Sequence, residues 1–535
     1  MASTQLAPKH HKYTEQNYLS ADLALINTNV KTMNPKQPTA QAVAIAKNKI
    51  IRVGTNQQIR KLIGENTQVL DLKDKTVLPG LIDTHIHVTD YGRCLMWLDL
   101  TPAKSLLEIK NMIKEKATCM PKGKWIIGQG WNESRLKELR MPITANLDEA
   151  APDNPVIIYR EASMICAVNS MALKLSGVNE QTIIPDGGAV DKDPDTGKLT
   201  GIFRDTATTL VWQAVPEPTE GELLTATVFA CQKIFQAGIT SIHWLVISES
   251  ELSIIQKLHA MGQLMFRVNV VVPEALLEKK ATIKSENRDV LRVGGAFLVV
   301  DGYLDSKEAA LQEPYSDDPS NYGKMLLTEE ALAASVQKAL AFGVQPVIHA
   351  MGDKAIDEAL RIIEQTQKSN VRFRIEQAAV LNEALVQRLK KQDVVITIQP
   401  KVISTEFSVW SANQRIGDRA KWLHPLKTLL SQGITVAAGS DCPMEPLSAL
   451  LGIQELVTRP SCPEQRLSVD EAILLYTLNA AYCSGEDQIK GSIEEGKLAD
   501  LIVLAEDPSS VEPDKIKDIP LDFVILNGKL LVVTS

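Results

Sequence analysis

Near its start the chain reads Val77-Leu78-Pro79-Gly80-Leu81-Ile82-Asp83-Thr84-His85-Ile86-His87, an apolar run that contains a Pro-Gly turn and ends in a histidine pair. Side chains at positions i and i+2 of a strand point to the same face, so His85 and His87 can reach one metal ion. A His-x-His pair alone is weak evidence, because chance pairs on exposed strands are common. The turn and the apolar run make the context more specific and place the pair at the mouth of a predicted barrel.

The middle of the chain, about residues 79–490, alternates short apolar strands with helical stretches such as Glu329–Ala341 and Ala355–Gln365. The predicted strands include Ile239–His243, Leu298–Asp301, Gln345–His349, Phe373–Glu376, Val394–Ile398 and Thr435–Asp441. Repeated strand–helix units over such a length predict an α/β fold, a (β/α)8 barrel of the TIM type. Several of the strands end in polar residues, and such barrels place their chemistry at the C-terminal ends of the strands.

The two ends of the chain have a different pattern, that of short β-strands. Strands are predicted at Ala21–Leu25, Ala42–Ala46, Ile50–Gly54, Asp500–Leu504, Phe523–Leu526 and Leu530–Val533. The last two flank Asn527-Gly528, a strong signal for a type I′ hairpin. We expect residues 19–78 and 491–535 to build one small β-sandwich domain together.

Two further segments complete the predicted domain organisation. Residues 1–18 are polar and are expected to form a flexible tail. The segment of about residues 98–225 is too long for a simple loop within a barrel, so we expect an inserted subdomain over the barrel mouth.

The composition restricts the class of protein. Of the 535 residues 44% are hydrophobic, enough for a large core, and the net charge of −8 argues against a nucleic-acid or anionic-membrane surface. The seven cysteines are scattered without a C-x-x-C pair, as expected in a reducing compartment. No apolar stretch is long enough for a membrane span, and the polar start lacks a signal-peptide pattern, so a cytoplasmic location is predicted. The expected partner is a small-molecule substrate, and a homodimer is left open.

A series of short motifs, in order along residues 21–535, is similar to one known family. The motifs are Leu78–His87, Gly128–Asn132, Val168–Ser170, Asp301-Gly302, Glu313–Tyr315, His349–Asp353, Arg374–Glu376, Gly439–Pro443 and Gly491–Asp500. Each is modest alone, but together they resemble the amidohydrolase superfamily, in its YtcJ-like, N-substituted formamide deformylase-like branch (amidohydrolase family 3). The resemblance implies a (β/α)8 metal hydrolase with a β-sandwich formed from both chain ends, in agreement with the pattern above.

Four residues are the metal ligands that the resemblance leaves in this chain: His85, His87, His349 and Asp441. A carboxylate such as Asp441 that touches both an ion and its water can take up a proton and later pass it to the leaving nitrogen. The structural alternatives are histidines that cap or pack the barrel without metal, and an aspartate that caps a helix.

Three positions depart from the family pattern. Phe297 aligns with the lysine of strand 4 that becomes carboxylated in two-metal members, and a phenyl ring cannot ligate. Gln377 stands where a histidine follows Arg-Ile-Glu, and Met164 stands where a histidine is usual. The ligands that remain suit one divalent ion with an open position for water. We expect zinc, with iron or manganese as alternatives.

Other candidate residues lie in or near the same motifs. Substrate-binding candidates are Trp131, Arg160, Met164, Asp301 and Tyr315, for which ordinary packing or loop shaping is the alternative. The amide of Gln377 could donate to a substrate carbonyl or orient the water, although it cannot transfer protons as histidine does. His243, at the end of another predicted strand, could compensate in part as a further catalytic residue.

These observations favour a metal-dependent hydrolase of a non-peptide C–N bond, in a small amide, a cyclic amide or an N-formyl compound. One alternative is a binding protein with a relict site, which the three departures favour and the four retained ligands disfavour. The other is a metal-dependent enzyme that does not hydrolyse, such as a decarboxylase, because fold does not fix function.

Overall fold

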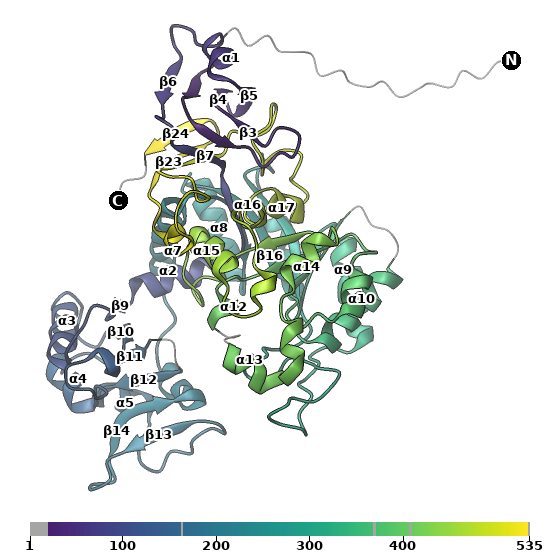
Figure 1. Ribbon diagram of the computed structural model, residues 1–535. Coiled ribbons are helices and arrows are strands. Elements are labelled where there is room, and N and C mark those ends of the chain that lie inside the picture. The colour runs from purple at the N-terminus through teal and green to yellow at the C-terminus, as the bar shows by residue number, and fades with distance from the viewer. Residues whose placement is uncertain (1–19, 162–163, 367–370, 406–408, 533–535) are drawn as a thin grey trace. The chain divides into compact units, whose positions relative to one another are not determined.

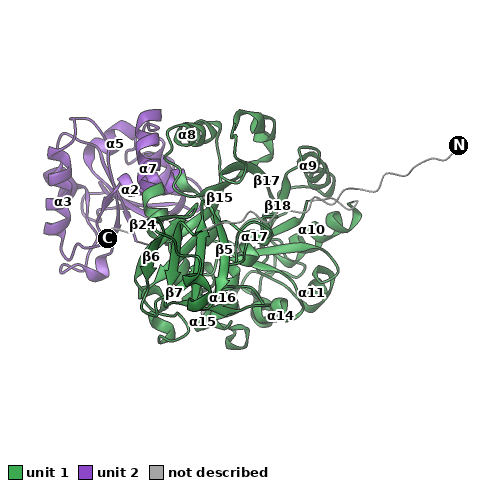
Figure 2. Cartoon of the chain, turned by 90° about the horizontal axis from the view of Figure 1, so that it is seen from above, with its two compact units in different colours: residues 1–88, 231–535 green, residues 89–230 purple. Residues whose placement is uncertain are grey.

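The computed structural model describes residues 20–161, 164–366, 371–405 and 409–532. The chain forms two compact units, one of residues 1–88 and 231–535 and one of residues 89–230 (Figure 2). The predicted tail, residues 1–18, lies outside the described residues. Along the described parts of the chain, no helix combines the length and the apolar character that crossing a membrane requires.

The first unit contains an eight-stranded sheet in which all paired neighbours are parallel. In chain order the strands are β8 (Leu81–Ile86), β15 (Ile239–Leu245), β16 (Arg267–Pro273), β17 (Leu291–Val299), β18 (Gln345–Ala350), β19 (Phe373–Gln377), β20 (Val394–Ile398) and β21 (Val436–Ala438). Spatial order follows chain order, as repeated right-handed strand–helix units require. The predicted (β/α)8 barrel is confirmed.

Helices join successive strands of the barrel and follow its last strand (Figure 1). They are α8 (Glu249–Ala260), α9 (Glu329–Ala341), α10 (Asp353–Gln365), α11 (Glu383–Leu389), α12 (Val402–Thr405), α13 (Val409–Ile416), α14 (Leu426–Ser431), α15 (Ala449–Thr458), α16 (Val469–Leu475) and α17 (Leu478–Cys483). Helix α9 has the predicted bounds because Thr328 caps its N-terminus, accepting from the Ala331 N–H. The main core lies between these helices and the strands, for example where Leu360 and Ile375 are fully buried.

The barrel is joined between its first and last strands at their C-terminal ends. The N–H of Asp441 donates to the carbonyl of His85 at 2.8 Å, and the N–H of His87 donates to the carbonyl of Cys442 at 2.9 Å. Gly439 permits this approach, because a Cβ there would lie 2.4 Å from the backbone nitrogen of His85. The junction therefore brings the residues after β21 against the histidine pair that ends β8.

Both chain ends contribute to two further sheets of the first unit, where purple and yellow strands lie together in Figure 1. One has the order β5 (Lys49–Gly54), β4 (Ala42–Ala46), β1 (Leu23–Ile26) and β6 (Gln68–Asp71); the other has β24 (Lys529–Val532), β23 (Leu521–Leu526), β22 (Leu501–Leu504), β7 (Thr76–Pro79), β2 (Asn29–Lys31) and β3 (Thr39–Ala40). One buried cluster joins residues of both sheets, including Leu25, Val43, Val77 and Leu501. This shared core is what a β-sandwich requires.

The turn between β23 and β24 is the predicted hairpin. Asn527 and Gly528 have φ values of 52° and 73°, the left-handed conformation that both central residues of a type I′ turn adopt.

The β-sandwich formed by the two chain ends is held against the barrel by a buried ion pair. In this pair Arg267 of β16 donates to both carboxylate oxygens of Asp500, at 2.5 and 3.0 Å.

The second unit has a mixed six-stranded sheet of its own. The order is β13 (Ala189–Lys192), β14 (Leu199–Arg204), β12 (Ile165–Val168), β11 (Val156–Arg160), β10 (Ile126–Trp131) and β9 (Leu98–Asp99). Its helices include α3 (Leu106–Thr118), α4 (Thr144–Ala150), α5 (Ser170–Ser176) and α6 (Thr209–Trp212), and α2 (Val88–Met96) and α7 (Glu220–Gln236) lie at its two ends in the sequence. An inserted subdomain was expected for about residues 98–225, without any prediction of its sheet; its position over the barrel mouth stays a prediction.

The close approach at Gly439 gives a test of the barrel junction. We expect Gly439→Ala to lower the free energy of unfolding by about 1–3 kcal/mol, because the added methyl group must displace the backbone at His85. Thermal unfolding followed by circular dichroism measures the change. Gly221→Ala in α7 is the control, since a Cβ there meets no atom within 4 Å and alanine favours a helix by up to ~1 kcal/mol. Equal melting temperatures for Gly439→Ala and wild type would contradict the junction.

Candidate metal centre

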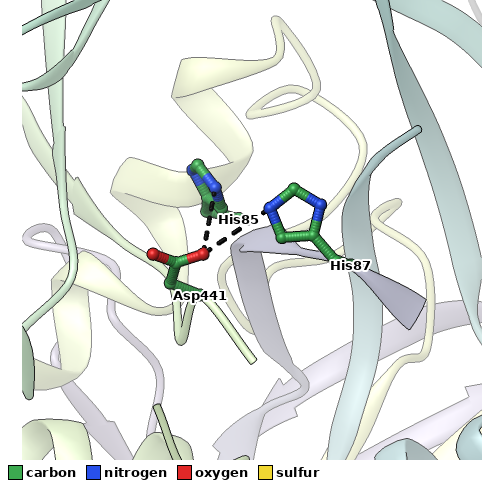
Figure 3. Close-up of side chains that lie close together, drawn as sticks. All are labelled: His85, His87 and Asp441. Carbon is green, nitrogen blue, oxygen red and sulfur yellow. Dashed lines mark ion pairs between the residues drawn. The ribbon is translucent and has the colours of Figure 1, made fainter. Parts of the chain in front are cut away.

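Three potential ligands converge where β8 and β21 meet: His85, His87 and Asp441 (Figure 3). His85 and His87 lie on the same side of the strand end, as their spacing predicts. Their Nε2 atoms lie 3.4 and 3.6 Å from the same atom, Asp441 Oδ1. His85 and Asp441 are buried and His87 is half-buried, so the three atoms meet in a largely enclosed place.

The geometry of this group fits a metal ion. Two ligand atoms that bind one tetrahedral ion at about 2.1 Å are about 3.4 Å apart. The separations of Asp441 Oδ1 from the two imidazole nitrogens agree with that value. Two imidazoles and a carboxylate are also a donor set that zinc, iron and manganese accept. The three residues could therefore hold a divalent cation and leave a coordination position for water.

The local electrostatics also favour a cation. Burial alone would disfavour charge on His85, but the carboxylates of Asp441 and Glu376 on its two sides raise its pKa above the ordinary value. Burial and the neighbouring Glu376 and Asp83 raise the pKa of Asp441 to about 6. Burial and the nearby His85 lower the pKa of His87 to about 3, so that His87 is a neutral imidazole, the form that ligates. The surroundings of His85 thus favour a positive charge, which a metal ion would supply.

Backbone strain marks the strand ends that carry the site. Asp441 has a φ of 61°, and Gln377, the last residue of β19, has a φ of 71°. Left-handed backbone is uncommon for residues other than glycine and clusters at functional sites. Asp441 holds this conformation because its N–H is bonded to His85, which aims the carboxylate at the two imidazoles.

Glu376 lies beside the ligand group, although no role was predicted for it from the sequence. It is fully buried in β19, and its Oε1 lies 3.3 Å from His85 Nδ1. Arg374 forms a very short ion pair with Oε2 of Glu376 and holds its pKa well below the usual range despite burial. Two charged residues at i and i+2 of an apolar strand were the signal in the sequence, since both must point to one side of β19.

His349 stands apart from the close group of three ligands. It lies in β18 and is buried, and neither ring nitrogen has a hydrogen-bond partner. The ring of Phe297 packs against both imidazoles, with its centroid 6.0 Å from that of His85 and 6.3 Å from that of His349. Nδ1 lies 3.8 Å from Asp301 Oδ1, whereas a buried Nε2 without a hydrogen-bond partner is costly and fits a nitrogen kept for a ligand. Metal binding by His349 stays a prediction.

Asp301 and Tyr315 have structural partners. Asp301 is fully buried and accepts from the N–H groups of Ala310, Met351 and Gly352 at 2.8–2.9 Å, and burial raises its pKa to about 7. Tyr315 is also buried and donates to the carbonyl of Ala309 at 2.9 Å. These contacts favour the alternative of loop shaping, and substrate binding by either residue stays a prediction.

Gln377 and His243 lie in different surroundings. The Oε1 atom of Gln377 is buried without a partner beside the strained strand end, so this amide is available to a ligand. His243 Nδ1 lies 3.0 Å from Nη1 of Arg374, which can only donate, so the ring proton is on Nε2. His243 thus belongs to the buried network around Arg374, and its catalytic role stays a prediction.

The remaining three candidates lie in the second unit. Trp131 packs in the core of that unit, where its indole N–H donates to the carbonyl of Ile158 at 3.0 Å. Arg160 forms a two-fold ion pair with Glu133 at 2.7 and 3.0 Å. Met164 has an exposed side chain. Their contact with substrate stays a prediction.

Comparison with known proteins agrees with this fold and site. The amidohydrolase family matches residues 68–532. YtcJ of Bacillus subtilis is 31% identical, with 95% of this chain and 98% of YtcJ covered, and the N-substituted formamide deformylase of Arthrobacter pascens is 25% identical, with 95% and 98% covered. The crystal structure of an uncharacterized metal-dependent hydrolase from Pyrococcus furiosus is similar with a TM-score of 0.76 and 29% identity, over 91% of this chain and 100% of that one.

A barrel whose first and last strands bring two histidines and an aspartate together defines a metal-dependent hydrolase. The chain belongs to the amidohydrolase family.

The ligand group gives a direct test by elemental analysis of protein purified without a histidine tag or added metal. We expect about one equivalent of divalent metal in wild type and its loss in the double variant His85→Ala/His87→Ala, since Asp441, even together with His349, supplies too few ligands to hold the ion. His259→Ala in α8, outside the ligand group, should retain the metal. Two equivalents would contradict the single-ion site, and no metal after reconstitution would favour the relict binding protein.

Proposed function

We propose that the protein hydrolyses a non-peptide C–N bond with one divalent ion, zinc in the first instance, and with Asp441 as general base and acid. The observation that carries the proposal is the convergence of His85, His87 and Asp441 on one small volume at the C-terminal ends of β8 and β21. Active sites of (β/α)8 barrels lie at that end. Iron and manganese are the alternatives that the same donor set accepts.

The ion would be held by His85 Nε2, His87 Nε2 and Asp441, with His349 as the expected fourth ligand. When bound, it supplies Lewis-acid polarisation of the substrate carbonyl and lowers the pKa of water to about 7. Asp441 has two carboxylate oxygens, of which Oδ1 faces both histidines. Asp441 takes the proton of the attacking water and delivers it to the nitrogen that leaves, so that the C–N bond breaks and an amine and an acid form.

Gln377 is the proposed partner of the substrate carbonyl. Its side chain is buried beside the strained end of β19, and its Oε1 has no hydrogen-bond partner. The amide can donate one N–H to the oxygen that becomes negative during attack, or orient the water through Oε1. It cannot exchange protons, which leaves Asp441 as the residue that moves the proton.

The substrate class follows from what such a site can cleave. A carbonyl that is polarised at one ion and attacked by water suits a small amide, a cyclic amide or an N-formyl compound. The relative named N-substituted formamide deformylase supports the last of these as the first class to test. A decarboxylase would instead release carbon dioxide from an acid, so amide and acid substrates with product analysis separate the two reactions.

Asp441→Asn tests the proton-transfer role. The variant retains an oxygen that can ligate but loses the basic carboxylate, so we expect kcat to fall by about 10²–10⁴-fold with metal content retained. Turnover is measured as amine released from N-substituted formamides, small amides and cyclic amides. Asp418→Asn, at an exposed position of the 3-10 helix Gly417–Trp422, is the control and should match wild type. Wild-type turnover in Asp441→Asn would exclude Asp441 as the base.

A further inference from the structure

A second layer of polar groups lies behind His85, on the side away from Asp441. Glu376 Oε1 lies 3.3 Å from His85 Nδ1, and the amide nitrogen of Gln399 lies 3.2 Å from the same Nδ1. Gln399 follows β20 and also donates to Glu376 Oε1 at 2.7 Å. All three residues are buried, so their hydrogen bonds are not exchanged for water.

The ion pair with Arg374 fixes which groups donate in this layer. Arg374 is always charged and holds Glu376 as a carboxylate, which only accepts. Gln399 must therefore present its NH2 group to Glu376, and its Oε1 remains buried without a partner. That NH2 group also faces His85 Nδ1. His85 thus has an acceptor and a donor competing for one ring nitrogen.

The two contacts favour different tautomers of His85. A proton on Nδ1 can be donated to Glu376, which leaves Nε2 with a free lone pair toward Asp441 and the ion site. A bare Nδ1 can instead accept from Gln399, which puts the proton on Nε2 and blocks ligation. Partners of the second ring nitrogen commonly fix the tautomer of metal-ligating histidines in this way.

We propose that Glu376 is the positioning residue of the metal centre and that Gln399 opposes it. Glu376 accepts a hydrogen bond from the Nδ1–H of His85 and so leaves the Nε2 lone pair free for the ion, whereas Gln399 stabilises the tautomer that cannot ligate. The inference rests on the proposed metal site and deepens it. The affinity for the ion is set by two neighbouring side chains with opposite effects: Glu376 raises the affinity and Gln399 lowers it.

The zinc affinity of the full-length protein, measured by competition with a chromophoric chelator, tests the effect of each of the two side chains. In Glu376→Gln the amide oxygen accepts from Arg374, so the NH2 group faces His85 and favours the tautomer that cannot ligate. We expect the zinc Kd to rise about 10–100-fold. In Gln399→Met the donor is removed at similar volume; we expect the Kd to fall about fivefold, the equilibrium factor of one net hydrogen bond. Equal affinity of wild type and Glu376→Gln, or weaker or equal binding in Gln399→Met, overturns the corresponding role.

Gln345→Met is the matched control for loss of a buried glutamine. Gln345 is also buried in a barrel strand, but its amide donates to the carbonyl of Cys483 and not to Glu376 or His85. We expect Gln345→Met and Gln399→Met both to lower the melting temperature, because each loses a buried hydrogen bond. Only Gln399→Met should change the zinc Kd. A fivefold gain of affinity in Gln345→Met would show that the effect of Gln399→Met is not specific, and would overturn the proposal.

A measurement on wild type covers the case in which Glu376→Gln does not fold. In zinc-loaded protein labelled with ¹⁵N-histidine, we expect His85 to show a protonated, hydrogen-bonded Nδ1, assigned by its loss in His85→Asn. An unprotonated Nδ1 overturns the role of Glu376. Absence of zinc binding by wild type overturns the proposed function as well, whereas zinc binding with equal affinity in Glu376→Gln overturns the positioning role alone.

Discussion

The junction between β8 and β21 is the constraint on which the site depends. The two strands meet through two hydrogen bonds, between Asp441 and His85 and between His87 and Cys442. These are also the residues that carry the candidate ligands, so closing the barrel and assembling the site are the same event. The small side chain of Gly439 allows the approach, and the left-handed backbone of Asp441 turns its carboxylate toward the imidazoles.

Behind this junction lies a layer of buried charged side chains. An unpaired charge in the apolar barrel would cost a large desolvation free energy. Arg374 is the centre of the layer: it contacts Glu376, His243 and the carbonyl of Thr84. The network links β8, β15 and β19 across the barrel interior. Such a layer costs desolvation free energy, and its use here is to fix the direction and the tautomer of a ligand rather than to stabilise the fold.

The sequence predicted the elements whose signals are local. The period of the apolar residues placed α9, the Asn527-Gly528 pair placed the hairpin, and the spacing of His85 and His87 placed both on one face. Contacts between distant strands were not readable. Gln399 meets His85 across 314 positions of sequence, and no local pattern marks that pair. The sheet of residues 98–204 was likewise expected only as an insertion, and its pairing of β14 with β12 joins strands that are not consecutive in the chain.

The surroundings of Phe297 explain why one ion is the simpler expectation. Two ions in a hydrolase site are about 3.5–4 Å apart and need ligand atoms between them. Here the phenyl ring of Phe297 makes T-shaped contacts with the imidazoles of both His85 and His349. It offers no lone pair, and its apolar surface would desolvate a second cation without compensating it. A single ion at the β8–β21 junction can therefore supply the positive charge that the carboxylates of Asp441 and Glu376 favour on the two sides of His85.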